Sequence, residues 1–289
     1  MLLRAAKNNS CALRRAAAGS RALSSSSGTE FTVEKLGGAH EGVALFSLSR
    51  PASRNALGRA MMDEFRSALD AVRFDTGVRV VVVQSTVDRV FCAGADLKER
   101  VAMTPPEVGA FVHGLRSAFS GLEALPMPTI AAIEGAAMGG GLELALACDF
   151  RVCGSGAVLA LPETGLAIIP GAGGTQRLPR LIGMSKAKEM CFTGRRVGHD
   201  EALAIGLADR AVDAGGALDA ALALAAEMLP KGPVALRMAK QAINAGMQVD
   251  ITSGMAVEQA CYAQVIPTKD RMEGLQAFRE KRKPEYTGE

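Results

Sequence analysis

Short apolar and β-branched runs alternate with helical patterns along the first part of the chain. Residues 31–36 and 43–48 have the composition and length of two paired strands, and residues 78–84 (VRVVVVQ) predict a buried strand. Between them, apolar side chains recur every three or four positions. That spacing predicts an amphipathic helix over about 57–73.

A second helix is expected to begin at residues 104–107 (TPPE). There the threonine can cap, a proline fits the first turn, and the glutamate completes a capping box. Pro126 and Pro128 end this helix before a strand expected at 129–133. Alternation of strands and helices continues to about residue 213, which favours an α/β core with parallel pairing.

After residue 213 the strand patterns stop. Consecutive helices are expected over residues 216–229, 233–246, 250–264 and 268–282. We therefore divide the body of the chain into a core at 28–215, which carries the active site, and a helical C-terminal region at 216–289. A helical region after an α/β core is typical of a module for packing or assembly.

The first 27 residues differ from the rest, with five arginines or lysines, no acidic residue and a serine run at 24–27. This composition predicts a mitochondrial targeting segment. The alternative is a basic tail with affinity for nucleic acid. Loss of the segment would remove five positive charges and change the formal charge of the whole chain from +3 to −2. The remaining body is not basic, and its charge does not indicate a nucleic-acid partner.

Composition narrows the function classes further. With 48% hydrophobic and 22% charged residues among 289, the chain can bury a large core. No apolar run reaches the length of a membrane span. The three histidines are scattered and the six cysteines form no CxxC, so no metal site is expected.

Two glutamates stand inside otherwise apolar segments. Glu143 lies in residues 138–144 (MGGGLEL), and Glu163 lies in residues 161–165 (LPETG). An ionised carboxylate is costly to bury without a partner. If both face one cavity, they cannot both ionise easily, and one can keep its proton near neutral pH. Such a pair can add or remove water, so the sequence predicts an enzyme.

The glycines at 139–141 lie between the strand expected at 129–133 and an apolar helix beginning near Leu142. Glycines allow close approach of the backbone and leave N–H groups available at a helix N-terminus, where they can stabilise an oxyanion. The alternative is tight backbone packing without a ligand. Residues 90–98 are small and follow the strand at 78–84, where ligand sites of α/β folds gather.

Three motifs in this order resemble those of the enoyl-CoA hydratase (crotonase) superfamily. They are residues 91–100 (FCAGADLKER), 138–145 (MGGGLELA) and 169–179 (IPGAGGTQRLP). The resemblance extends from residue 31 to the end. Within the superfamily, residues 261–271 and 277–282 are most similar to mitochondrial methylglutaconyl-CoA hydratases and their paralogues with an enoyl-CoA hydratase domain.

This resemblance implies a fold and an activity. The fold would be α/β, a crotonase-like spiral of ββα units with a helical C-terminal trimerisation region, giving a homotrimer or a hexamer of paired trimers. The activity would be that of a hydro-lyase, which adds water across the 2,3 double bond of a short-chain or branched enoyl-CoA. The expected setting is fatty-acid or leucine breakdown in the mitochondrial matrix, with no cofactor beyond the coenzyme A of the acyl-CoA thioester substrate.

The resemblance also implies catalytic roles. The N–H groups of Ala95 and Gly140 would hold the thioester oxygen and stabilise the enolate. Glu143 would take the proton from water, and Glu163 would supply the proton to the α-carbon. The presence of both glutamates favours hydration over double-bond isomerisation.

Substrate-binding positions follow from the same resemblance. The expected set is Ala56, Ala93, Asp96, Leu97, Lys98, Gly139, Phe278 and Lys281. Within it, Lys98 and the Lys281 side chain of a neighbouring subunit would contact the phosphates. The alternative for both lysines is a solvated surface charge.

The two alternative functions are RNA binding and a non-catalytic role in assembly. One relative binds AU-rich RNA through a lysine-rich helix that corresponds to residues 54–73, but this segment has no lysine, and three acids offset its four arginines. That mixed charge disfavours RNA binding. A non-catalytic assembly protein is the other alternative, and the intact Glu143 and Glu163 argue against it. The sequence leaves open whether the acyl chain is straight and short or branched and doubly acidic.

Overall fold

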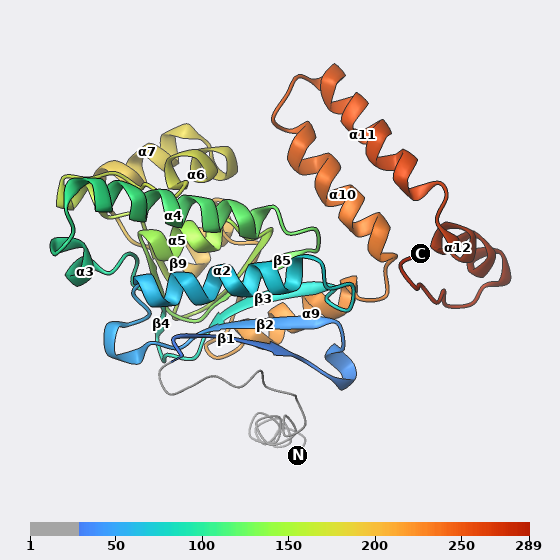
Figure 1. The fold of residues 1–289 in the computed structure, drawn as a ribbon, viewed down its shortest axis with the longest axis horizontal. Helices are drawn as coiled ribbons and strands as arrows, with labels where there is room; N and C mark the ends of the chain where they lie inside the picture. The colour runs from blue at the N-terminus through green and yellow to red at the C-terminus, as the bar shows by residue number, and fades with distance from the viewer. Residues whose placement is uncertain (1–28) are drawn as a thin grey trace, which may run out of the picture.

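The computed structural model describes residues 29–289, so the expected targeting segment lies outside the described residues. A six-stranded sheet forms the centre of the fold (Figure 1). Its strands, in spatial order, are β1 (Phe31–Lys35), β2 (Val43–Leu48), β3 (Val80–Ser85), β5 (Thr129–Ile133), β7 (Phe150–Gly154) and β10 (Arg210–Val212). The β1–β2 pair is antiparallel and the other neighbours are parallel.

A smaller sheet of four strands stands beside the first. Its strands are β4 (Val90–Cys92), β6 (Ala136–Met138), β8 (Val158–Ala160) and β9 (Val197–Gly198). Three times in succession, a strand of the large sheet is followed by a strand of the small sheet and then by helical structure. This repeat confirms the expected α/β spiral of ββα units.

Helices cover both faces of the large sheet. On one face, α2 (Arg59–Arg73) and α4 (Pro105–Glu123) pack over a core in which Phe65 meets the rings of Phe31 and Phe119 edge-on, at 5.2 and 6.4 Å between centroids. On the other face, α9 (Ala217–Met228) packs against β3, β5 and β7. Burial on both faces explains why these strands read as continuous apolar runs rather than alternating ones.

The sequence-based elements agree with the structure apart from some of their ends. Glu107 accepts a hydrogen bond from the Thr104 N–H at 2.8 Å, which confirms the expected capping box at the start of α4. The strand expected from residue 78 begins two residues later as β3, because the backbone N–H of Val78 bonds to Asp75 in a turn. The helix expected near Leu142 begins earlier, at Gly140.

The remaining helical elements of the core lie between its strands. They are α3 (Leu97–Val101), α5 (Gly140–Leu146), α6 (Gly174–Ile182), α7 (Met184–Thr193), α8 (His199–Ala204), and the 3₁₀ turns η1 (Gly38–His40), η2 (Pro51–Ser53) and η3 (Glu163–Leu166). None of the described helices is long and apolar enough to cross a membrane.

The last three helices stand away from the sheets. Helices α10 (Pro233–Gly246) and α11 (Ile251–Val265) form a hairpin that projects beside the core, and α12 (Lys269–Glu280) lies past its base (Figure 1). Large apolar side chains are exposed on this region, among them Ile251 at 76% and Phe278 at 86%. These helices thus expose large apolar side chains that no other described part of the chain covers.

Candidate active site

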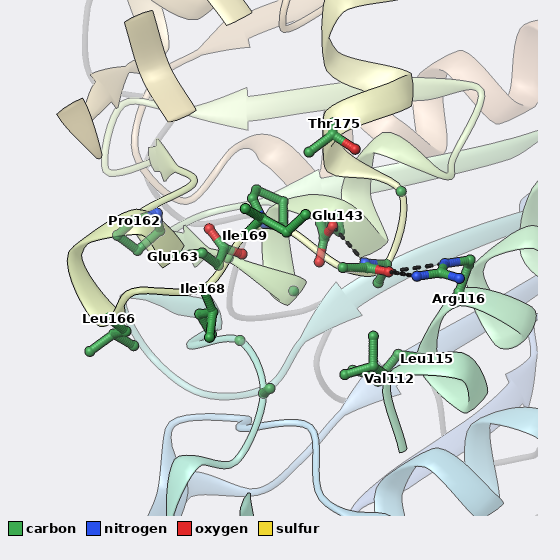
Figure 2. Close-up of a pocket in the computed structure, with 18 of the residues that line it drawn as sticks. Val112, Leu115, Arg116, Glu143, Pro162, Glu163, Leu166, Ile168, Ile169 and Thr175 are labelled. Carbon is green, nitrogen blue, oxygen red and sulfur yellow. Dashed lines mark hydrogen bonds between the residues drawn. The ribbon is translucent and has the colours of Figure 1, made fainter. Parts of the chain in front are cut away.

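One pocket collects most of the residues that the sequence singled out. It has a volume of about 790 Å³ and is lined by the loop after β4, the β6–α5 junction, the start of η3, the loop before α6 and one face of α4. Figure 2 shows Glu143 and Glu163 directed into it from two different elements. Apolar side chains such as Val112, Leu115 and Ile168 complete the wall.

The β6–α5 junction depends on glycine. Gly139 has a φ of 52°, and its N–H donates to the Ala160 carbonyl at 2.9 Å. A Cβ on Gly141 would lie 2.3 Å from the carbonyl oxygen of Cys92, so α5 packs directly on the backbone of β4. Any side chain at this position would push the helix away from the strand.

This close packing brings two backbone N–H groups to the same side of the pocket. A Cβ placed on Gly140 would lie 3.5 Å from the Ala95 nitrogen. In the described part of the chain, neither the Ala95 nor the Gly140 N–H has a hydrogen-bond acceptor. Two neighbouring N–H groups without acceptors form a site for a carbonyl oxygen that becomes negatively charged.

A polar network beneath the pocket fixes the loop that carries Ala95. The buried Asn55 side chain donates to the Phe91 carbonyl at 3.0 Å and accepts from the Arg50 N–H at 2.7 Å. Arg50 also pairs with Asp96 at 2.7 Å. Because buried polar groups that lose a partner are costly, this network holds the loop in one conformation.

Glu143 is held by the loop before α6. Only 3% of the residue is exposed, and Oε1 accepts hydrogen bonds from the N–H groups of Ala172 and Gly174, both at 2.8 Å. Burial raises the pKa of Glu143, while the two N–H donors and the charge of Arg177 act against that rise. The donors favour the ionised form of this carboxyl group.

Glu163 has a different environment. It is 9% exposed, and its buried Oε2 has no hydrogen-bond partner among the described residues. Burial, with a further contribution from the negative charge of Glu143, raises the pKa of Glu163 to about 7. With a pKa of about 7, Glu163 keeps a substantial protonated fraction near neutral pH, and it lacks the two N–H donors that favour the ionised form of Glu143. The pocket thus brings together the groups that a base, an acid and an oxyanion site require.

Seven of the predicted site residues line the pocket. They are Ala93, Ala95, Leu97, Gly139, Gly140, Glu143 and Glu163. Asp96 lies outside the lining, since its side chain caps α3 by accepting from the N–H groups of Lys98 and Glu99. Ala56 is buried beside it, and Lys98 is exposed. Phe278 and Lys281 belong to the end of α12, on the opposite side of the molecule from α3 (Figure 1).

Sequence reasoning missed two arginines and the role of one loop. Arg100 and Arg116 both line the pocket, and Figure 2 shows Arg116 bonded to the Gly171 carbonyl. The loop over residues 168–174 supplies the N–H donors to Glu143. Its glycine-rich sequence was a signal for this role, because backbone donors need close approach. No group of three or more potential metal ligands occurs within residues 29–289.

Comparison with known proteins gives a consistent result. Residues 38–289 match the family model described as enoyl-CoA hydratase/isomerase. Mitochondrial enoyl-CoA hydratase domain-containing protein 2 of Mus musculus is 53% identical over 263 residues, which cover 90% of this chain and 89% of that protein. Mitochondrial methylglutaconyl-CoA hydratase of Homo sapiens is 52% identical over 264 residues, which cover 90% of this chain and 78% of that protein. These matches confirm the resemblance read from the sequence.

A solved structure extends the comparison to the fold. The crystal structure of enoyl-CoA hydratase from Bacillus anthracis superposes with a TM-score of 0.86 at 46% sequence identity. The match covers 90% of this chain and the whole of that chain. The expected crotonase-like fold is therefore confirmed.

The packing of α5 on β4 predicts the effect of one methyl group. Gly141→Ala places a Cβ against the Cys92 carbonyl, and we expect the free energy of unfolding to fall by about 1–3 kcal/mol, the usual cost of overpacking. Thermal unfolding at fixed protein concentration measures the loss. Gly165→Ala, where a Cβ meets no atom within 4 Å, is the matched control. Equal stability of the two variants would contradict this account of the junction.

The raised pKa of Glu163 predicts a pH-dependent stability. Between its ordinary value of 4.5 and about 7, the folded protein binds more protons at this site than the unfolded chain, so stability falls as pH rises. Glu163→Gln removes the ionisable group and, with it, the free-energy cost of ionising that group in the folded protein. We expect the variant to be more stable than the wild type by about 1–3 kcal/mol at pH 8, and the difference to vanish near pH 4.

Chemical denaturation at both pH values measures this difference. The exposed Glu41→Gln is the matched control and should show no such pH dependence. A stability difference for Glu163→Gln that is the same at pH 4 and pH 8 would show that the Glu163 proton is not linked to folding.

Proposed function

This chain belongs to the enoyl-CoA hydratase/isomerase family and is an enzyme of the hydro-lyase type, and from that premise we propose that it adds water across the 2,3 double bond of a short-chain or branched enoyl-CoA. One observation carries the proposal. Two buried carboxyl groups with different hydrogen-bond environments share a pocket with two N–H groups that lack acceptors.

The proposed mechanism assigns each group a step. The thioester oxygen accepts from the N–H groups of Ala95 and Gly140, which stabilise the negative charge of the enolate. Glu143 takes a proton from water while the water oxygen bonds to the β-carbon. Glu163 gives its own proton to the α-carbon. One proton is taken up and one is released, so the pair holds a single proton before and after the reaction.

The substrate's own thioester and water suffice for this chemistry, so we propose no further cofactor. The names of relatives support two substrate types, an enoyl-CoA and methylglutaconyl-CoA. Ala56, Asp96 and Lys98 lie next to the pocket-lining loop and are proposed to flank the coenzyme A, with Lys98 near its phosphates.

The exposed apolar surface of the C-terminal helices supports assembly. We propose that α10, α11 and α12 of one chain pack against other copies, giving a homotrimer or a hexamer of paired trimers. Phe278 and Lys281 lie outside the lining of the chain's own pocket, and we propose that in such an assembly they reach the pocket of a neighbouring subunit.

We further propose that the enzyme acts in the mitochondrial matrix, in fatty-acid or leucine breakdown. The relatives from Mus musculus and Homo sapiens are both named as mitochondrial. The acid-free, arginine-containing composition of residues 1–27 supports the same location.

The arginines of α2 give no support to RNA binding. Arg66 pairs with Asp63, and Arg59 pairs with Glu107 across the groove to α4. These two pairs offset part of the positive charge of α2 and so weaken its attraction for a phosphate backbone.

Turnover of enoyl thioesters tests the proposed function. We expect the purified protein to consume crotonyl-CoA or methylglutaconyl-CoA. The loss of the enoyl thioester absorbance measures this turnover. Glu163→Gln and Glu143→Gln should each lower kcat by about 10²–10⁴-fold, the usual contribution of a general acid or base. Glu41→Gln is the control. Full activity of either pocket variant would overturn the mechanism, and a wild type inactive on both substrates would overturn the function.

Sedimentation tests the proposed assembly. We expect the wild type at three or six times the 30.0 kDa of one chain. Ile251→Glu should lower this mass, because it places a charge in the proposed contact surface. Phe74→Glu, at an exposed apolar residue on the core, is the matched control. A wild type that sediments as a monomer would contradict the proposal.

A further inference from the structure

The charged residues of the pocket do not suit a purely aliphatic ligand. Besides the two glutamates, the lining contains two arginines, Arg100 on α3 and Arg116 on α4. A guanidinium group remains charged under all ordinary conditions, and covering it with an apolar chain without a partner is costly. The two arginines differ in whether the protein itself supplies that partner.

Arg116 has its partner within the protein. Its Nε and Nη2 donate to the Gly171 carbonyl at 3.1 and 2.9 Å, as the dashed lines in Figure 2 show. Gly171 belongs to the loop whose next residues hold Glu143. Arg116 is therefore placed to support Glu143.

Arg100 has no such partner. Its half-buried side chain makes no hydrogen bond and no ion pair with any residue in the range 29–289. The neighbouring Glu99 and Asp96 are both engaged with Arg50. Arg100 lines the same pocket as Glu163, the residue proposed to act at the α-carbon, and its positive charge acts to lower the pKa of Glu163. The phosphates of coenzyme A are separated from the reacting carbons by the whole pantetheine arm.

We propose that Arg100 binds a carboxylate at the far end of the acyl chain, so that the preferred substrate is the coenzyme A thioester of a short unsaturated dicarboxylic acid. The inference rests on the proposed function and specifies its substrate class. Arg100 is then a specificity residue, and Arg116 supports the catalytic loop.

Charge balance in the pocket explains why this substrate class fits. A second carboxylate on the ligand would be repelled by the negative charge that the two glutamates share. A nearby guanidinium offsets that repulsion and can form charge-assisted hydrogen bonds with the carboxylate. A neutral acyl chain would leave the same guanidinium without a partner. The apolar side chains of Leu166 and Ile168 contact the methylene or methyl groups between the two ends.

Two matched pairs of ligands isolate the carboxylate. Glutaconyl-CoA and crotonyl-CoA differ only by the terminal carboxyl group, as do the saturated glutaryl-CoA and butyryl-CoA, which cannot be hydrated. For Arg100→Met we expect the preference for the dicarboxylic member, in kcat/KM and in Kd, to fall about 10- to 100-fold, the range for a lost hydrogen bond to a charged group. Arg100→Lys should retain part of the preference, because it keeps the charge.

Arg116→Met is the matched control. We expect it to weaken turnover of both enoyl substrates alike, because it releases the loop that holds Glu143. Taking the ratio within each pair removes any effect that a substitution exerts through Glu163 or Glu143. An unchanged ratio in Arg100→Met, or a ratio that falls only in Arg116→Met, would overturn the inference. The binding ratio decides the matter even if neither enoyl-CoA is turned over, so this failure is distinguishable from failure of the proposed function.

Discussion

Two carboxyl groups in one largely buried pocket cannot both be ionised at low cost, and the rest of the site depends on how this conflict is resolved. Two backbone N–H groups favour the charged form of Glu143, whereas Glu163 has an oxygen without any donor in the described structure. This difference in donors favours the shared proton on Glu163. On the proposed mechanism, this asymmetry lets Glu143 act as a base and Glu163 as an acid at the same pH.

The site depends on backbone N–H groups that lie close to the reacting groups, and glycine residues allow this close approach. At Gly141 the helix packs on β4 with no room for a side chain, and that contact sets the distance between the N–H groups of Ala95 and Gly140. The arrangement costs stability, because Glu163 is buried without a donor. The wide hydrophobic contacts of the large sheet with α2, α4 and α9 offset this cost.

The sequence predicted most of the sheet and the two glutamates, because both have strong local signals. An apolar run such as that in β3, or a glutamate between leucines, is informative without knowledge of its neighbours. The N-terminal end of α5 was placed too late, since helix propensity disfavours glycine and here tertiary contact outweighs it. The cap formed by Asp96 and the two roles of the arginines were not predictable. They depend on which segments meet in space, as Arg100 differs from Arg116 only in its surroundings.

The central claim is that Glu163 acts at the α-carbon and Glu143 at the water. Exchange of the α-hydrogens of butyryl-CoA in ²H₂O, followed by mass spectrometry, tests this division directly, because exchange needs enolate formation but no water addition. At pH 8, above the pKa of about 7 where Glu163 is ionised and can accept the proton, we expect exchange with the wild type and with Glu143→Gln, and a loss of exchange with Glu163→Gln. Exchange that persists in Glu163→Gln and disappears in Glu143→Gln would contradict it.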